Sequence, residues 1–315
     1  MPKIVSMINW KGGVGKSTLS LHLGVGIMRS GSNGKRARVL LVDLDPQCNL
    51  SYLALGVSGY IDYVYDNKNP TLKNLFDSYF KGEIFKTSDA IIGRPIKASP
   101  GNVWLNVDLL PSHHELVLVD MRLAREKKSG TTHQEETKYE IDKLSIINNA
   151  IAQVADQYDY VILDCPPNIN LVTQNSFFAS DSYVIPAIPD FLSTVGISLI
   201  RSEMDRMNKS FGQMIGYAGV EMKYSNADLK GIIFNMVDEY GGGPKNTHRA
   251  TINSTGVQHP GMVFDNYVTD GDGISTAADS NMTVYSYDHF PKARANGEKQ
   301  ADALMKVSQE FIAKI

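Results

Sequence analysis

A glycine-rich loop near the N-terminus restricts the possible folds of this chain more than any other feature of its sequence. The loop consists of Trp10, Lys11, Gly12, Gly13, Val14, Gly15, Lys16, Ser17 and Thr18. Residues 3–9 before it form a short and mostly apolar segment, which is typical of a buried strand. The residues after it run from Leu19 to Ser30 without a proline and meet Gly31, which predicts a helix with a glycine stop. This order of elements is typical of an α/β sheet.

A glycine-rich turn between a strand and a helix is suited to binding phosphate. Its small residues let backbone N–H groups approach the oxygens, and the helix N-terminus adds a favourable field. Lys16 supplies a mobile positive charge, and Ser17 supplies a hydroxyl for Mg²⁺. A glycine-rich turn without a ligand is the alternative. We disfavour it because the strand, the glycines, both lysines and the helix all fall in register.

Two further apolar segments end in aspartates. Residues 37–43 read as a parallel strand that ends at Asp43, with Asp45 two residues later. Ligands bind α/β sheets at the carboxyl ends of strands, where Asp43 can hold a water of the Mg²⁺ shell and Asp45 can orient an attacking water. The alternative is that Asp45 or Asn49 caps a short helix over residues 50–55.

Residues 160–164 read as another strand ending in an aspartate, which is the Walker B arrangement. It predicts that Asp164 lies near the Mg²⁺ shell. The alternative is an acidic turn residue that only closes the strand.

These three motifs resemble those of the ParA/MinD family. The loop has Trp10 where the ordinary P-loop has glycine, and Lys11 completes the deviant pattern K-G-G-x-G-K-S/T. Residues 43–49 resemble D-x-D-P-Q-G-N, with Cys48 in place of the glycine. Residues 164–175 resemble D-x-P-P-S/N-x-G-x-x-T-x-N, with Asn170 in place of the glycine. Asparagine tolerates a left-handed backbone better than most residues, so the fold can survive that change.

The resemblance implies one α/β domain over residues 1–315, with a mostly parallel sheet, helices on both faces and an insertion at about 56–102. It corresponds to the short ParA type without an N-terminal winged-helix domain. The implied cofactors are ATP and Mg²⁺. The implied nucleotide contacts are Lys11, Gly12, Gly13, Val14, Gly15, Lys16, Ser17, Thr18, Pro189, Asp190 and Asn235, and the implied metal residues are Ser17, Asp43 and Asp164.

Within this set, the resemblance gives each side chain a role. Lys16 holds β- and γ-phosphate oxygens, and Thr18 contacts the α-phosphate. Lys11 reaches across a sandwich dimer to the partner's nucleotide, so Lys11, Lys16 and Asp45 are the implied catalytic residues. Asn235 reads the adenine edge, and the Pro189–Asp190 loop flanks the base. An ordinary turn residue at a strand end is the alternative for Asn235.

The function implied is that of a DNA partition ATPase with weak intrinsic hydrolysis. Its ATP-bound homodimer would bind DNA non-specifically and be released when a centromere-binding or adaptor protein stimulates hydrolysis. A related positioning ATPase with a protein cargo is the second hypothesis. A P-loop metabolic enzyme, such as an amide-forming or reductase relative, is the third. Cys48 and Cys165 are not spaced to ligate the cluster that a reductase needs.

The charge and composition of the chain limit how it can contact DNA or a membrane. The 315 residues carry a net charge of -3, so DNA contact requires a local patch. Family resemblance favours scattered basic residues in the later part of the chain, although solvated helix faces also explain them: Arg201, Arg206, Lys292, Arg294 and Lys299. The absence of a C-x-x-C pair and of a long apolar run predicts a cytoplasmic protein. The family resemblance implies that it associates with the nucleoid when ATP is bound. A terminal helix with packing positions such as Leu304 and Phe311 argues against a membrane anchor.

The remaining segments yield simpler expectations. We expect a turn over 30–35, strands over 103–110, 182–188, 231–237 and 263–269, and a flexible loop over 238–246. Helices are expected over 114–128, 138–157, 193–211, 247–257, 274–280 and 296–315. Aromatic residues crowd the insertion, which favours a satellite core over a partner surface. Adjacent His113 and His114 are expected to point apart, without a third ligand, so no metal is predicted there.

Overall fold

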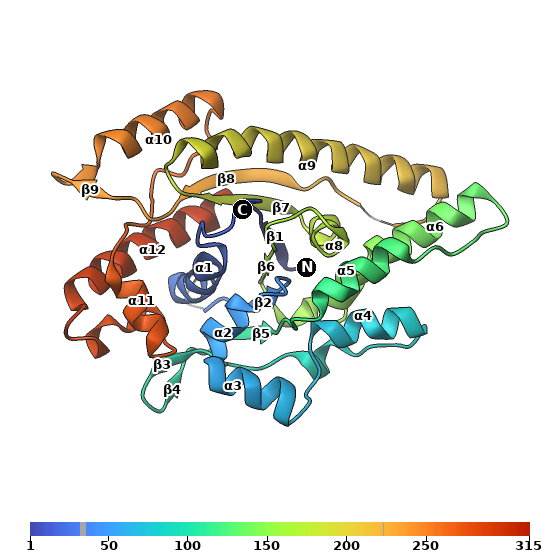
Figure 1. Cartoon of the computed structure of the whole chain (residues 1–315), viewed down its shortest axis with the longest axis horizontal. Coiled ribbons are helices and arrows are strands. Elements are labelled where there is room, and N and C mark those ends of the chain that lie inside the picture. The colour runs from blue at the N-terminus through green and yellow to red at the C-terminus, as the bar shows by residue number, and fades with distance from the viewer. Residues whose placement is uncertain (32–35, 223) are drawn as a thin grey trace.

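The chain folds around a six-stranded sheet in a computed structural model that describes residues 1–31, 36–222 and 224–315 (Figure 1). The strands stand in the order β5-β2-β6-β1-β7-β8, and every pairing between them is parallel. Their bounds are β1 Lys3–Met7, β2 Val39–Asp43, β5 Val107–Leu110, β6 Tyr160–Asp164, β7 Ser182–Ala187 and β8 Asp228–Phe234. The predicted α/β fold with a parallel sheet is confirmed, and the carboxyl ends of all six strands lie at one edge.

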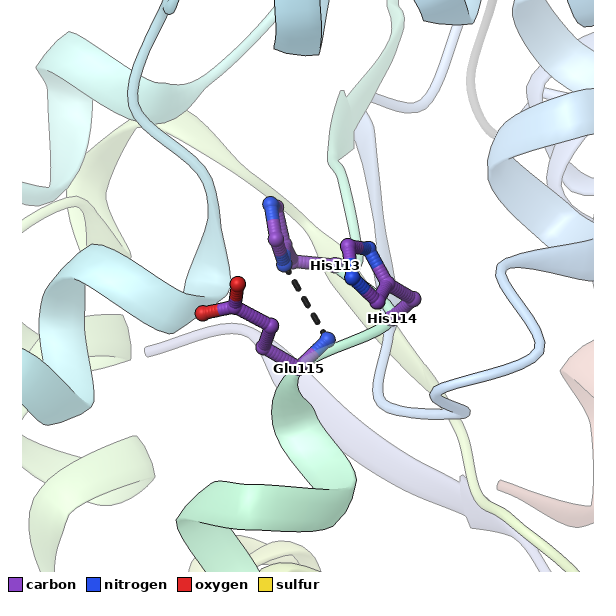
Figure 2. Close-up of side chains that lie close together, drawn as sticks. All are labelled: His113, His114 and Glu115. Atoms are coloured by element: carbon purple, nitrogen blue, oxygen red, sulfur yellow. Dashed lines mark hydrogen bonds between the residues drawn. The ribbon is translucent and has the colours of Figure 1, made fainter.

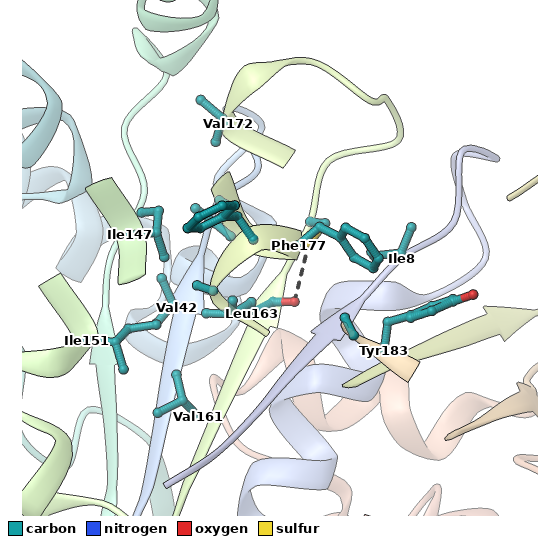
Figure 3. Close-up of a cluster of buried hydrophobic side chains, with 14 of the residues drawn as sticks. Ile8, Val42, Ile147, Ile151, Val161, Leu163, Val172, Phe177 and Tyr183 are labelled. Carbon is teal, nitrogen blue, oxygen red and sulfur yellow. Dashed lines mark hydrogen bonds between the residues drawn. The ribbon is translucent and has the colours of Figure 1, made fainter. Parts of the chain in front are cut away.

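Each face of the sheet is covered by helices, because alternate strand residues point to opposite sides. On one side, residues such as Val39, Leu41 and Ile162 join a core with α1 Lys16–Ser30, α2 Asn49–Leu55 and α12 Arg294–Lys314. On the other side, Val42 and Leu163 pack with the opposite helix layer (Figure 3). That layer comprises α4 Leu72–Lys81, α5 Leu116–Arg125, α6 His133–Leu144, α7 Ile146–Ala152, α8 Leu171–Ala179 and α9 Phe191–Ala218.

The segment between α2 and β5 holds several short elements. They are α3 Val57–Ile61, the π-helical η1 Asp62–Asp66, α4, the 3-10 turn η2 Thr87–Ala90, and the paired β3 Lys97–Ser99 and β4 Asn102–Val103. Tyr60 and Val64 bury themselves with Cys48 in a small cluster, which confirms the expected satellite core. Phe76 of α4 instead joins the main core. The aromatic residues therefore divide between two cores.

Two sequence-based boundaries are wrong, and the first has a cause far away in the chain. The helix expected over 138–157 is divided at Ser145. The Asn175 side chain donates to the carbonyl of Lys143 (2.9 Å) and accepts from the N–H of Ile147 (3.4 Å), so it satisfies both new helix ends. The strand expected over 103–110 begins only at Val107.

The strand expected over 263–269 is also wrong, because only isolated bridges form at Val263 and Thr269. Between them, the N–H groups of Asp265 and Asn266 donate to the Glu310 carboxylate at 2.9 and 3.1 Å, away from the sheet. The loop expected over 238–246 contains the short pair β9 Glu239–Tyr240 and β10 Gly243–Pro244.

The remaining helices follow the expected pattern. These helices are α10 Asn246–Gln258, α11 Asp272–Asp279 and α12, and the 3-10 segment η4 Val284–His289 precedes α12. The turn expected over 30–35 falls mainly on residues 32–35, outside the described residues. Among the helices of the described ranges, none is both long enough and apolar enough to cross a bilayer.

Candidate functional site

The glycine-rich loop joins β1 to α1 at the carboxyl edge of the sheet, as the sequence predicts. Gly13 and Gly15 adopt φ values of +75° and +79°, a left-handed conformation that side chains disfavour. Gly15 is required for a second reason, because a Cβ there would lie 2.2 Å from Nδ2 of Asn235. The loop is thus shaped by backbone conformation and by close contact with the residue that follows β8.

Lys16 points its ammonium group back into this loop. Nζ donates to the carbonyls of Asn9 (3.0 Å) and Lys11 (3.3 Å), and the residue is 7% exposed. Burial lowers the pKa of Lys16, while the nearby carboxylates of Asp164 and Asp45 oppose that change. The amine is therefore held where the loop curves, close to both aspartates.

Asp43 and Asp164 are register partners at the ends of β2 and β6, and both are fully buried. Asp43 accepts hydrogen bonds from the N–H and hydroxyl of Ser51 at 2.8 and 2.7 Å. Asp164 accepts one from Ser20 at 3.1 Å through Oδ1. Burial raises the pKa of Asp164 to about 6, opposed by hydrogen bonding with Ser17. Burial and the charge of Asp164 also raise the pKa of Asp43.

The same carboxylates suit a divalent cation. Among the described residues, Oδ2 of Asp164 is buried without a hydrogen-bond partner. Buried oxygens of two carboxylates, with the Ser17 hydroxyl nearby, form the hard donor set that Mg²⁺ prefers. A cation there would favour the charged forms of both carboxylates, which burial and neighbouring carboxylates disfavour. The residues present therefore fit the predicted magnesium ion.

Asp45 does not cap α2. It is 6% exposed and its carboxylate accepts the N–H of Gln47 at 2.9 Å, while Cys48 occupies the N-cap position. The carbonyl of Asp45 accepts the Ser112 hydroxyl at 2.7 Å, and the N–H of Ser112 donates to Ser51 Oγ at 3.0 Å. These serines support the aspartates, although no sequence motif indicates them.

The two residues that replace glycines behave differently. Cys48 adopts φ +57°, so this position does need the left-handed conformation, and the thiol is buried against the Tyr60 hydroxyl at 3.2 Å. Asn170 has φ -67° and stands at the N-cap of α8. The left-handed backbone considered for Asn170 is thus absent, and its replacement of glycine carries no such strain.

Lys11 lies beside Asp190, which immediately precedes α9. Its Nζ is 2.6 Å from Oδ2 of Asp190, and its N–H donates to the Asn9 side chain at 2.9 Å. Both side chains are about one-third exposed (34% and 40%), so the pair lies at the solvent-facing rim of the site. The structure therefore brings together two predicted nucleotide contacts from distant parts of the chain.

Asn235 lies next to a pocket of about 360 Å³ beside the start of α1. Its Nδ2 donates to the carbonyl of Val14 at 3.2 Å. Thr18 and Asn235 both line the pocket, which continues along the loop at 269–271 and α11. Within the described part of the chain, the lining does not include Pro189 or Asp190. Thr18 and Asn235 are thus brought together, whereas the Pro189–Asp190 loop lies apart from this pocket.

The predicted DNA-contacting cations do not form one patch. Arg201 and Arg206 lie on α9, whereas the other three lie within or just before α12. Three of the five are paired with carboxylates in the same chain: Arg206 with Glu203, Arg294 with Asp288, and Lys299 with Glu239. Their charge is therefore partly neutralised.

His113 and His114 do not point apart, which corrects the sequence-based expectation (Figure 2). Their rings stack with centroids 4.6 Å apart, and Glu115 brings a carboxylate close to both. Each residue is already engaged, however. His113 Nδ1 accepts the Glu115 N–H at 3.1 Å, His114 Nδ1 lies 2.6 Å from the Tyr65 hydroxyl, and Glu115 pairs with Lys73. These contacts account for one ring nitrogen of each histidine and for the Glu115 carboxylate.

Comparison with known proteins identifies the family of the chain. A family model described as an AAA domain matches residues 2–216. The sporulation initiation inhibitor protein Soj of Bacillus subtilis is 30% identical over 76% of this chain and 74% of its own length. A virulence plasmid ParA family protein, pGP5-D of Chlamydia psittaci, is 31% identical over 75% of this chain and 70% of its own.

Two solved structures share the fold. A variant of Cyanothece McdA in complex with ATP superposes with a TM-score of 0.65 at 19% identity, covering 96% of each chain. Cobyrinic acid a,c-diamide synthase of Mycobacterium smegmatis, bound to an ATP analogue and magnesium, gives 0.56 at 21% identity over 82% of this chain and 81% of its own. On the family match and the sequence relatives, the chain belongs to the ParA family of P-loop ATPases.

Proposed function

We propose that this chain is an ATP-dependent DNA partition ATPase that works as a nucleotide-controlled homodimer. The observation that carries the proposal is the juxtaposition of Lys16 with two buried aspartates, Asp45 and Asp164, beneath a glycine loop that also presents Lys11. The printed names of relatives, among them a ParA family protein and a chromosome-partitioning ATPase of Treponema pallidum, support the partition role.

The phosphates of ATP would bind along the glycine loop. Lys16 exchanges its two carbonyl contacts for β- and γ-phosphate oxygens, and Thr18 contacts the α-phosphate. Beside Thr18, the pocket next to Asn235 offers room for the base and ribose. Pro189 and Asp190 would approach the base only if their loop moved toward this pocket.

Ser17, Asp43 and Asp164 would hold Mg²⁺, which when bound neutralises the charge on the phosphates. Ser51 and Ser20 keep the two carboxylates oriented through the hydrogen bonds described above. Asp45 would orient the attacking water. Positioning of this kind is the main contribution that a protein makes to phosphoryl transfer.

Lys11 would complete the site of a second subunit. In this proposal it leaves Asp190 and reaches the partner's nucleotide, so that dimer formation and hydrolysis both depend on one lysine. The ATP-bound dimer would double the DNA-facing surface and bind DNA non-specifically. The candidate contacts remain Arg201, Arg206, Lys292, Arg294 and Lys299. A centromere-binding or adaptor protein would stimulate hydrolysis and release the dimer from the nucleoid.

A salt titration of DNA binding with ATP, with ADP and without nucleotide tests the proposal. We expect binding with ATP only, falling steeply as salt rises. Equal binding in all three conditions would contradict a nucleotide-controlled dimer. Dimerisation and hydrolysis without DNA binding would instead favour the second candidate, a positioning ATPase with a protein cargo. The ion pairs that neutralise three of the five candidate cations favour that alternative.

A further inference from the structure

Helix α5 presents an apolar and basic surface to solvent. Val117, Leu118 and Met121 are 52%, 56% and 48% exposed, although each is a large apolar side chain. Arg122 and Arg125 follow on the same helix and line a shallow hollow of about 280 Å³ with Leu118, Met121 and Glu126. We call the three apolar residues and the two arginines the α5 surface, and Glu126 adds a carboxylate to the lining of the hollow. Contiguous exposed apolar groups next to charges mark binding sites more often than single exposed residues do.

Arg122 of this surface, and Lys128 three residues after Arg125, each lie over an aromatic ring. The guanidinium of Arg122 lies 3.8 Å from the ring centroid of Phe80, and Nζ of Lys128 lies 4.9 Å from that of Tyr79. Both rings belong to α4, in the aromatic-rich segment. A cation that is already oriented loses less conformational freedom when it pairs with a carboxylate.

Helix α5 and the segment just before it are hydrogen-bonded to the two segments that follow the strand-end aspartates. Within α5, Oδ1 of Asp120 accepts the N–H of Val172 at 2.8 Å, at the first turn of α8 after Asp164. Just before α5, the hydroxyl of Ser112 donates to the carbonyl of Asp45 at 2.7 Å. Displacement of α5 would therefore move the supports of Asp45 and of the segment after Asp164.

We propose that the α5 surface is the docking site for an acidic, amphipathic helical segment of a partner protein, and that its binding alters ATP hydrolysis. The proposal rests on the ATPase function proposed above and names the partner's chemistry. Apolar residues on such a helix would cover Val117, Leu118 and Met121, while its carboxylates would meet Arg122 and Arg125.

Two other occupants fit this surface less well. A DNA backbone would pair with the arginines but would leave the three apolar side chains facing phosphates and water. A second copy of the chain, packed two-fold on the same surface, would bring Arg122 and Arg125 against the same cations. An acidic helix is the occupant that satisfies both the apolar and the basic residues.

A displayed library of random helical peptides, selected on the nucleotide-free full chain, identifies a probe for this surface. We expect the selected peptides to combine acidic and apolar residues. In fluorescence anisotropy, Leu118→Glu and Arg122→Glu should each weaken peptide binding by about tenfold or more. Ile84→Glu, which alters a 99% exposed apolar residue elsewhere, should leave it unchanged. Selection of basic peptides, or equal binding to all variants, would overturn the proposal.

The same variants separate the competing occupants. If Leu118→Glu abolishes DNA binding or ATP-dependent dimerisation while peptide binding is unchanged, the surface serves DNA or a second copy, and the proposal is wrong. The selected peptide should change the hydrolysis rate severalfold in the wild-type protein, and an unaltered rate would refute the link to α5. A wild-type protein without any ATPase activity would refute the proposed function and the link to hydrolysis but not the docking site, because peptide binding is measured without nucleotide.

Discussion

Nζ of Lys11 lies 2.6 Å from Oδ2 of Asp190, so the lysine proposed to serve a second subunit is paired within its own chain. Asp190 adjoins the start of the long helix α9, where a carboxylate is favoured by the helix N-terminus. If Lys11 leaves Asp190, the N-terminus of α9 still stabilises the negative charge of the Asp190 carboxylate. The pair is also partly exposed, and such pairs contribute only about 0–1 kcal/mol. The Lys11–Asp190 ion pair is therefore weak enough for Lys11 to exchange it for a contact with the nucleotide of a partner subunit.

Asp190 competes with the partner's nucleotide for Lys11, and replacing Asp190 with Asn should remove that competition. We expect ATP-dependent dimerisation, followed by sedimentation or light scattering, to strengthen by up to about fivefold, since about 1 kcal/mol corresponds to that factor. Asp77→Asn is the matched control, because Asp77 makes a 2.6 Å ion pair with Lys73 away from the loop. If Asp190 chiefly contacts the base, Asp190→Asn will instead weaken ATP binding and leave dimerisation no stronger.

Replacing Lys11 with Ala should abolish the ATP-bound dimer and lower hydrolysis by about 10³-fold or more, the range known for a cation supplied in trans. ATP affinity of the monomer should change little, because Lys16 remains. Isothermal titration and a phosphate-release assay measure the two effects. A Lys11→Ala protein that dimerises with ATP and hydrolyses it at the wild-type rate would contradict the two-subunit site.

The central strands and the carboxyl-edge aspartates were predictable because their signals are local. An apolar run that ends at Asp43 or Asp164 is visible within a few residues. The break at Ser145 was not predictable, because Asn175 supplies the hydrogen bonds that stabilise it. The interruption of residues 263–269 likewise depends on Glu310, far along the chain.

The same distinction applies to the site. Lys16 and Ser17 belong to one motif, whereas the Lys11–Asp190 pair joins residues 179 positions apart. Ser112 supports Asp45 without belonging to any pattern. Cys48 and Asn170 both replace glycines, yet only Cys48 has a positive φ. Composition cannot distinguish those two cases, because the backbone conformation at each is set by packing.

The raised pKa of Asp164 predicts a pH-dependent stability. Its pKa rises from 3.8 to about 6 on folding, so between these values the folded protein binds more protons than the unfolded one. Nucleotide-free protein should therefore gain stability from this residue as the pH falls from 7 toward 4, the opposite of a salt-bridged aspartate. Asp164→Asn should remove that contribution and raise the apparent Tm at pH 7.

Magnesium provides the complementary measurement. Its binding should weaken below about pH 6, because protonated Asp164 is a poor ligand. Added Mg²⁺ at pH 7 should raise the Tm of the wild type more than that of Asp164→Asn. Thermal scans with and without Mg²⁺ across this pH range test both expectations. A Tm of the Asn variant that still responds fully to Mg²⁺ would place the metal elsewhere.

Tyr60 links the satellite core to the segment that carries Asp45, so its hydroxyl should affect both stability and hydrolysis. The fully buried hydroxyl donates to the carbonyl of Ser112 at 3.1 Å, and Ser112 in turn supports Asp45. Tyr60→Phe leaves that buried carbonyl unsatisfied, at a cost of about 1–3 kcal/mol in the free energy of unfolding. We expect hydrolysis to fall as well, because Asp45 loses part of its support.

Tyr63→Phe is the matched control, since the Tyr63 hydroxyl donates to the carbonyl of Pro70 at 3.3 Å but does not contact Ser112. Denaturant unfolding should reveal a cost for both variants, while steady-state hydrolysis at saturating ATP should fall only for Tyr60→Phe. Equal losses of activity in the two variants would mean that stability alone is responsible. In that case the hydrogen bonds from Tyr60 through Ser112 to Asp45 would have no part in positioning the attacking water.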